Sequence, residues 1–99
     1  MFEKNDKRRL YQLMDMYLSG VIAAPTFTDE FYFSYNLEID DEMLKETERK
    51  AFQKLDEISS RFSEFEEDLK EYPGTYFSEA ELRKKIIETK EKLKDEYTL

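Results

Sequence analysis

Glycine and proline, the residues that most often interrupt regular structure, are scarce in this chain of 99 residues, with two of each. They gather at two places: Gly20 is followed closely by Pro25, and Pro73 stands next to Gly74. Elsewhere the chain carries no strong break signal, so long regular elements are expected. The apolar residues recur at helical spacing, which makes these elements helices.

The first expected helix runs from about Asp6 to Ser19 and ends at Gly20. Its apolar face follows the i, i+3, i+4, i+7, i+8 pattern and comprises Leu10, Leu13, Met14, Tyr17 and Leu18. A second helix, short and aromatic, is expected to have Pro25 in its first turn, where the missing N–H costs nothing, and to continue through Tyr35. Residues 31–35, FYFSY, also suit a strand, but no partner strand is evident.

A third and longest helix is expected after the acidic stretch near residue 40, with Asp40 or Asp41 as its cap. Its expected apolar face comprises Leu44, Thr47, Ala51, Leu55, Ile58 and Phe62. The next segment, Ser63 to Glu71, is either an extension of this helix or a separate helical turn.

Residues 72–75, YPGT, have proline and glycine at the positions that a type II turn prefers. A fourth helix is expected to follow, because Ser78 and Glu81 have the spacing of a capping box. Its apolar stripe comprises Leu82, Ile86, Thr89, Leu93 and Tyr97. Four amphipathic helices with short connections predict an all-α fold: a mainly antiparallel four-helix bundle, with residues 1–99 as one domain.

The residue types that most often carry chemistry are missing. The chain has no histidine and no cysteine, so the usual general base, a Ser-His or Cys-His pair, a zinc site and a disulfide are not expected. The acidic stretch EIDDEMLKE lacks the glycine at which a calcium loop turns, and two glycines make no phosphate-binding loop. We therefore expect no enzymatic activity, cofactor or metal.

Charge narrows the class of partner. The 24 acidic and 16 basic residues give a net charge of −8, which disfavours nucleic acid and anionic membranes and favours a cationic partner. The alternative is that the surplus acid only keeps the protein soluble. No segment approaches about 20 uninterrupted apolar residues, and no targeting segment is evident, so a cytoplasmic location is expected.

Two stretches concentrate acidic residues. The first comprises Glu38, Asp40, Asp41 and Glu42. It precedes the third helix, where the helix dipole alone favours negative side chains. The second comprises Glu64, Glu66, Glu67, Asp68 and Glu71. It falls toward the far end of that helix, where the dipole disfavours acid, so it is the better candidate for a binding surface.

Aromatic residues accompany the second acidic stretch. Tyr72 and Tyr76 flank the Pro73-Gly74 turn, and tyrosine is frequent among residues that dominate binding energy. Alternatively, both rings fold inward and close the end of the bundle. Phe62, Phe65 and Leu69 are expected to belong to the core. The predicted binding residues are Glu64, Glu66, Glu67, Asp68, Glu71, Tyr72 and Tyr76.

A longer stretch, LYQLMDMYLSGVIAAPTFTDEFYFSY, resembles the colicin D immunity-like family of bacterial immunity proteins, which includes proteins of contact-dependent growth inhibition systems. The likeness runs over residues 10–93 and includes SRFSEFEEDL. Two departures are Pro25, where the family more often has a polar residue at the helix start, and the segment KEYPGTY.

The resemblance implies a four-helix bundle that binds a cognate nuclease toxin, typically one that cleaves tRNA in the anticodon loop, as a 1:1 complex. In that family, acidic residues near the end of the third helix meet the toxin's basic cleft. The corresponding positions are Glu64, Glu66, Glu67 and Asp68, with Ser59 and Ser60 before them. The alternative is a small acidic chaperone or adaptor, which would bind a partner helix in an apolar groove and usually dimerise.

Overall fold

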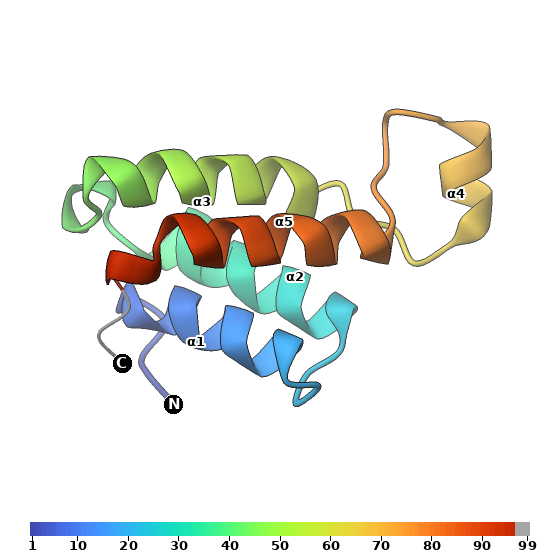
Figure 1. The fold of residues 1–99 in the computed structure, drawn as a ribbon. Helices are drawn as coiled ribbons and strands as arrows, with labels where there is room; N and C mark the ends of the chain where they lie inside the picture. The colour runs from blue at the N-terminus through green and yellow to red at the C-terminus, as the bar shows by residue number, and fades with distance from the viewer. Residues whose placement is uncertain (97–99) are drawn as a thin grey trace.

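The computed structural model describes residues 1–96, and this part of the chain is all-α, as predicted (Figure 1). Its helical elements are α1 (Arg8–Leu18), α2 (Ala24–Tyr32), η1 (Phe33–Glu38), η2 (Asp41–Met43), α3 (Glu46–Ser59), α4 (Glu66–Glu71), α5 (Glu79–Lys92) and η3 (Lys94–Glu96). The only β pairing recorded in residues 1–96 is an isolated parallel bridge between Phe62 and Phe77.

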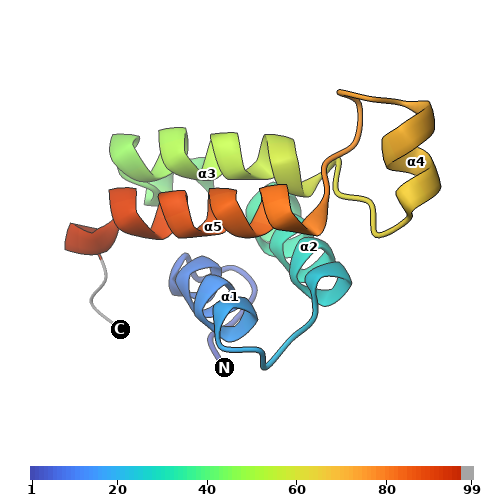
Figure 2. The same ribbon diagram turned by 45° about the vertical axis from the view of Figure 1, so that its right-hand side comes forward.

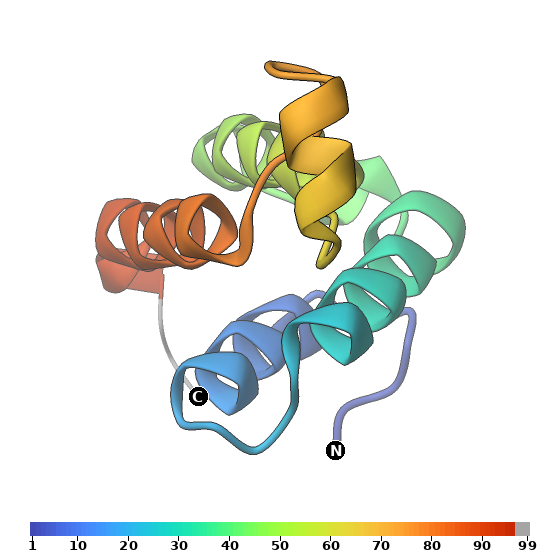
Figure 3. The same ribbon diagram turned by 90° about the vertical axis from the view of Figure 1, so that its right-hand side faces the viewer.

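The four longer helices are arranged as two pairs. α3 and α5 lie side by side and run in opposite directions, and α1 and α2 form a second pair that also reverses direction (Figure 1). Seen along α3 and α5, the helices α1 and α2 cross beneath them obliquely (Figure 3). The core therefore lies between two crossing layers, while α4 stands beyond the end of α3 and α5 (Figure 2).

Aromatic side chains form the centre of the core. The rings of Phe27, Phe31 and Tyr35 stack one on the next along α2 and η1, with centroids 5.5 and 5.4 Å apart. Phe52 of α3 packs against Phe31 at 6.1 Å and against Tyr11 of α1 at 5.5 Å. These large rings bury much area per residue, which allows a chain rich in charge to hold a core.

The first two helices begin and end close to the predicted residues. The predicted apolar face of α1 is confirmed, since Leu10, Leu13, Met14 and Tyr17 are buried and Leu18 is partly buried. Gly20 has a φ of +83°, a left-handed conformation that suits glycine just after a helix. α2 carries Pro25 in its first turn, as predicted.

The helix continues beyond α2 with a wider turn. η1 is a π-helix, in which the N–H of Ile39 bonds to the carbonyl of Ser34 at 2.8 Å, five residues earlier. The wider turn keeps Tyr35 against the core and leaves Phe33 and Leu37 exposed.

The third helix differs from the prediction at its start. Asp40 caps only the short η2, through a 3.0 Å bond from the N–H of Glu42, and α3 begins at Glu46. Leu44 is buried in the extended link between them. Ala51, Leu55 and Ile58 face the core as predicted, but Thr47 is exposed and the neighbouring Glu48 is buried in its place.

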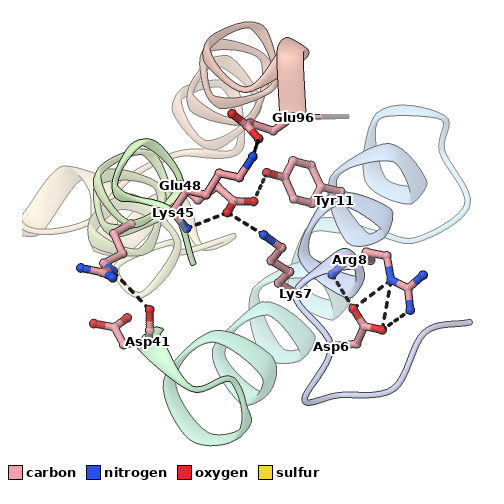
Figure 4. Close-up of polar contacts among 9 residues, drawn as sticks. Asp6, Lys7, Arg8, Tyr11, Asp41, Lys45, Glu48 and Glu96 are labelled. Carbon is pink, nitrogen blue, oxygen red and sulfur yellow. Dashed lines mark hydrogen bonds and ion pairs between the residues drawn. The ribbon is translucent and has the colours of Figure 1, made fainter. Parts of the chain in front are cut away.

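Glu48 is the most buried carboxylate among residues 1–96, at 1% exposure (Figure 4). It accepts hydrogen bonds from the backbone N–H of Lys45 at 2.8 Å, from Lys7 Nζ at 3.0 Å and from the Tyr11 hydroxyl. Burial alone would raise its pKa, but these donors outweigh burial and lower the pKa below the ordinary value. Glu48 thus stabilises the first turn of α3 and ties it to α1.

The fourth predicted helix is confirmed as α5. Ser78 and Glu81 form the expected capping box: Ser78 Oγ accepts from the Glu81 N–H at 3.3 Å, and Glu81 Oε1 accepts from the Ser78 N–H at 3.1 Å. The predicted stripe Leu82, Ile86, Thr89 and Leu93 is buried. Tyr97, the last member of that stripe, lies outside the described residues.

Candidate acidic and aromatic binding arm

The predicted binding residues lie on one excursion of the chain. After α3 ends at Ser59, the backbone leaves the core and returns only at the start of α5 (Figures 1 and 2). We call residues Ser63–Phe77 the arm. Its base is closed by two hydrogen bonds, from Ser63 N–H to the Phe77 carbonyl at 3.0 Å and from Phe77 N–H to the Arg61 carbonyl at 2.8 Å. The arm is therefore a closed loop that projects from the helical core.

The segment Ser63 to Glu71 proves to be a separate helix, α4, because α3 stops at Ser59. This changes the electrostatic argument about its acids. Glu66, Glu67 and Asp68 occupy the first turn of α4, where the helix dipole favours negative side chains. Among the five carboxylates of the second acidic stretch, only Glu71 lies at the C-terminal end of α4, where the dipole disfavours acid. The prediction that these acids stand where the dipole opposes them was wrong.

The arm still carries a clear excess of negative charge. Five carboxylates stand against a single lysine, Lys70, which pairs with Glu66 at 3.2 Å. Both partners of this pair are more than 70% exposed, so the pair contributes little to stability. Glu64, Glu67 and Glu71 are exposed. The arm therefore presents mostly free negative charge to solvent.

Asp68 has a structural role as well. Its Oδ2 accepts a 2.7 Å hydrogen bond from the Ser63 hydroxyl, and that hydroxyl accepts from the N–H of Phe65 at 3.1 Å. This chain of bonds ties α4 to the base of the arm. Of the two serines that precede the arm, Ser59 is buried and Ser60 is exposed. Ser59 is therefore a core residue.

Three of the four aromatic side chains of the arm are exposed, and Phe77 at its base is partly buried. Phe65 is 62% exposed, which contradicts its predicted place in the core. Phe62 packs against the core as predicted, whereas Leu69 is partly buried but is not among the side chains that pack there. The cause of the exposure of Phe65 is the early end of α3, which takes Phe65 off the helical face that Phe62 would have continued. Tyr72 and Tyr76 are also exposed, and their rings meet edge to face at 6.0 Å. Neither ring closes the end of the core.

The turn that joins these tyrosines is the predicted one. The N–H of Thr75 bonds to the carbonyl of Tyr72 at 3.0 Å, and Gly74 has a φ of +84°. A type II turn requires this left-handed conformation at its third residue. The turn brings Tyr76 back toward the base of the arm.

A shallow cleft, wide open to solvent, lies between the arm and the first turns of α2. It has a volume of about 290 Å³, and its walls include Pro25 and Thr28 on one side and Phe65 and Tyr76 on the other. Phe62, Glu64 and Asp68 also line it. The resulting surface combines aromatic rings with carboxylates.

The other acidic stretch lies elsewhere. Glu38, Asp40, Asp41 and Glu42 precede α3, whereas the arm follows it. With 14 residues, α3 separates the two by about 21 Å along its axis. They therefore stand at opposite ends of the molecule and do not form one surface (Figure 1).

The structure offers no sign of a metal centre or a membrane span in the part that it describes. Within residues 1–96, no group of three or more potential ligands could hold a metal ion. None of the helices in the same range has the length and apolar content needed to cross a bilayer.

Comparison with known proteins does not identify a family for this chain. No family model, curated protein or solved structure matches this chain.

Proposed function

We propose that this protein acts by binding, as an immunity protein whose arm covers a cationic surface of a cognate nuclease toxin. One observation carries the proposal: the arm holds exposed acidic and aromatic side chains away from the core. The resemblance of the sequence to colicin D immunity-like proteins supports a tRNA-cleaving nuclease as the partner. In this proposal the protein acts in the cytoplasm and catalyses no reaction.

Electrostatics supports such a role for the arm. A nuclease must bring phosphate groups to its active site, so its cleft is cationic. Exposed carboxylates on a projecting arm increase the rate of encounter with such a cleft, and added salt reduces this rate. Exposed rings such as Phe65 and Tyr72 supply the area that holds the complex together.

The proposal includes a finer description of the fold. We propose that α1, α2, α3 and α5 are the four members of a mainly antiparallel bundle, and that α4 is an insertion between the last two. The reversal of direction within each pair supports this (Figure 1). The oblique crossing of the two pairs is the feature that departs most from a regular bundle (Figure 3).

A chaperone or adaptor is the second candidate, and a different surface favours it. Tyr32, Phe33 and Leu37 are 48, 45 and 58% exposed where α2 passes into η1. Neighbouring exposed apolar side chains are typical of surfaces that receive a partner helix. Substitutions on this surface and on the arm therefore distinguish the two candidates.

The test is co-expression of this chain with the product of the open reading frame immediately upstream, followed by co-purification and cell survival. We expect the neighbour to be toxic alone and harmless in a stable complex with this protein. Reversing two exposed charges, with Glu66→Lys and Glu67→Lys together, should weaken the complex and restore toxicity. The matched control, Glu38→Lys with Glu42→Lys, makes the same change of net charge at the other end of α3.

Three outcomes contradict the proposal. The first is a neighbour that is harmless and does not co-purify. The second is an equal effect of the two double variants, which would show that only total charge matters. In the third, Phe33→Ala abolishes binding while the arm variant binds normally, which would favour the chaperone or adaptor.

A further inference from the structure

We infer that the cleft between the arm and α2 receives an arginine side chain of the cationic partner, an inference that rests on the proposed function. The sign of the charge is the first argument. Of the residues that line the cleft, Glu64 and Asp68 are acidic and none is basic. A cation that enters the cleft thus meets two carboxylates and no competing positive charge.

The carboxylates have free capacity to bind it. In the described part of the chain, Glu64 makes no recorded hydrogen bond or ion pair. Asp68 uses only Oδ2, for the Ser63 hydroxyl, which leaves Oδ1 available. Hydrogen bonds between a guanidinium and carboxylates are among the stronger ones in proteins, because both partners are charged.

The walls of the cleft select arginine over lysine. Phe65 and Tyr76 present exposed rings to the cleft, and Phe62 adds a partly buried one. A guanidinium is planar and weakly hydrated, so it stacks on such rings while its edge donates hydrogen bonds. A lysine ammonium is a compact, strongly hydrated charge and gains less from the same walls.

Elsewhere the protein already uses cations of its own in this way. Arg8 lies over the ring of Phe2 at 4.4 Å, Lys4 over Phe33 at 5.2 Å and Arg83 over Tyr17 at 5.6 Å. Within residues 1–96, no cation is recorded over Phe65 or Tyr76. These rings are therefore open to a cation from another molecule.

The arm side of the cleft is held in shape before any partner arrives. The joined base of the arm and the Ser63–Asp68 bond fix one wall, and α2 supplies the other. Because the wall on the arm needs little further ordering on binding, the complex forms at a lower entropic cost than it would at a flexible loop.

The experiment needs no partner protein. The isotope-labelled protein is titrated with N-acetyl-arginine amide, and backbone amide shifts are followed by NMR at constant ionic strength. N-acetyl-citrulline amide is the neutral probe of nearly the same shape, and N-acetyl-lysine amide has the same charge. We expect saturable shifts at residues that line the cleft, with affinity about fivefold weaker for lysine and weaker still for citrulline.

Variants of the protein complete the test. Glu64→Gln and Phe65→Ala change exposed side chains, so the fold should be retained, and each should weaken arginine binding severalfold. Glu67→Gln is the control, since it makes the same charge change on the arm outside the cleft. Equal shifts with arginine and citrulline, or equal loss in Glu64→Gln and Glu67→Gln, overturn the inference. The proposed function would survive that result if the co-expressed complex still depended on Glu66 and Glu67.

Discussion

Replacing Glu48 with alanine is expected to lower the free energy of unfolding by about 2–4 kcal/mol. The carboxylate is 1% exposed and accepts from Tyr11, Lys7 and the Lys45 N–H. Its removal takes away the hydrogen bond between the Tyr11 hydroxyl and a charged acceptor, at about 1.5–3 kcal/mol, and uncaps α3, at about 1 kcal/mol. The Lys7 side chain is 30% exposed and can be hydrated in the variant, so the loss of its ion pair adds less to the destabilisation.

Urea unfolding followed by far-ultraviolet circular dichroism at pH 7 measures this loss. With a urea slope of about 1–2 kcal/mol per molar, the midpoint should fall by roughly 1 M or more. The control is Glu46→Ala, which removes a carboxylate from the same helical turn. Glu46 is 78% exposed and pairs only with Lys50, at 3.4 Å, so a loss below about 0.5 kcal/mol is expected.

The dependence on pH provides a second, independent check. Folding lowers the pKa of Glu48 below its ordinary value of 4.5, so its ionised form stabilises the folded state above that pH. As pH falls from 4.5 through the lower pKa of the folded state, this stabilisation is lost. The difference in stability between the wild type and Glu48→Gln should therefore shrink over this range. A difference that stays constant, or a loss under 1 kcal/mol in Glu48→Ala, would refute the reasoning.

Further predictions concern the cap of α5, the two glycines with positive φ, and the arm. Ser78→Ala removes half of the capping box with Glu81 and should cost about 1 kcal/mol, measured as a shift in the urea midpoint. Gly74→Ala forces a side chain into a φ of +84°, so a loss of about 1–2 kcal/mol is expected on thermal unfolding, although nothing lies within 4 Å of the added carbon. Gly20→Ala, at a φ of +83°, should lower stability by a similar amount. If either substitution left the stability unchanged, the strain argument would be contradicted. Replacing residues 64–76 with a short glycine linker should leave cooperative unfolding intact, because none of them is buried; a loss of helical signal beyond that of α4 would show otherwise.

The sequence was sufficient to predict the parts of the fold that depend on local patterns. α1 and α5 appear with their predicted apolar faces because both carry a clean periodicity, and α5 also has a capping box at Ser78. The turn at Gly74 was equally readable, because proline and glycine occupy the positions that its geometry demands.

Interactions between distant residues could not be read in the same way. The burial of Glu48 depends on Lys7 and Tyr11, which lie 41 and 37 residues earlier, and a periodicity argument treats a glutamate as a surface residue. The end of α3 at Ser59 has no glycine or proline to mark it. For this reason the exposure of Phe65 was missed, and with it one wall of the cleft.

The closed base of the arm has a consequence for how such a protein can change over generations. The hydrogen bond between Ser63 and Phe77 uses backbone groups, and none of residues 64–76 is fully buried. Doubling the length of a closed loop costs only about 0.6 kcal/mol in entropy. Insertions, deletions and reversals of charge are therefore tolerated there while the helices stay the same. Under the proposed function, changes confined to one short stretch of the gene would be enough to alter the binding surface when the partner changes.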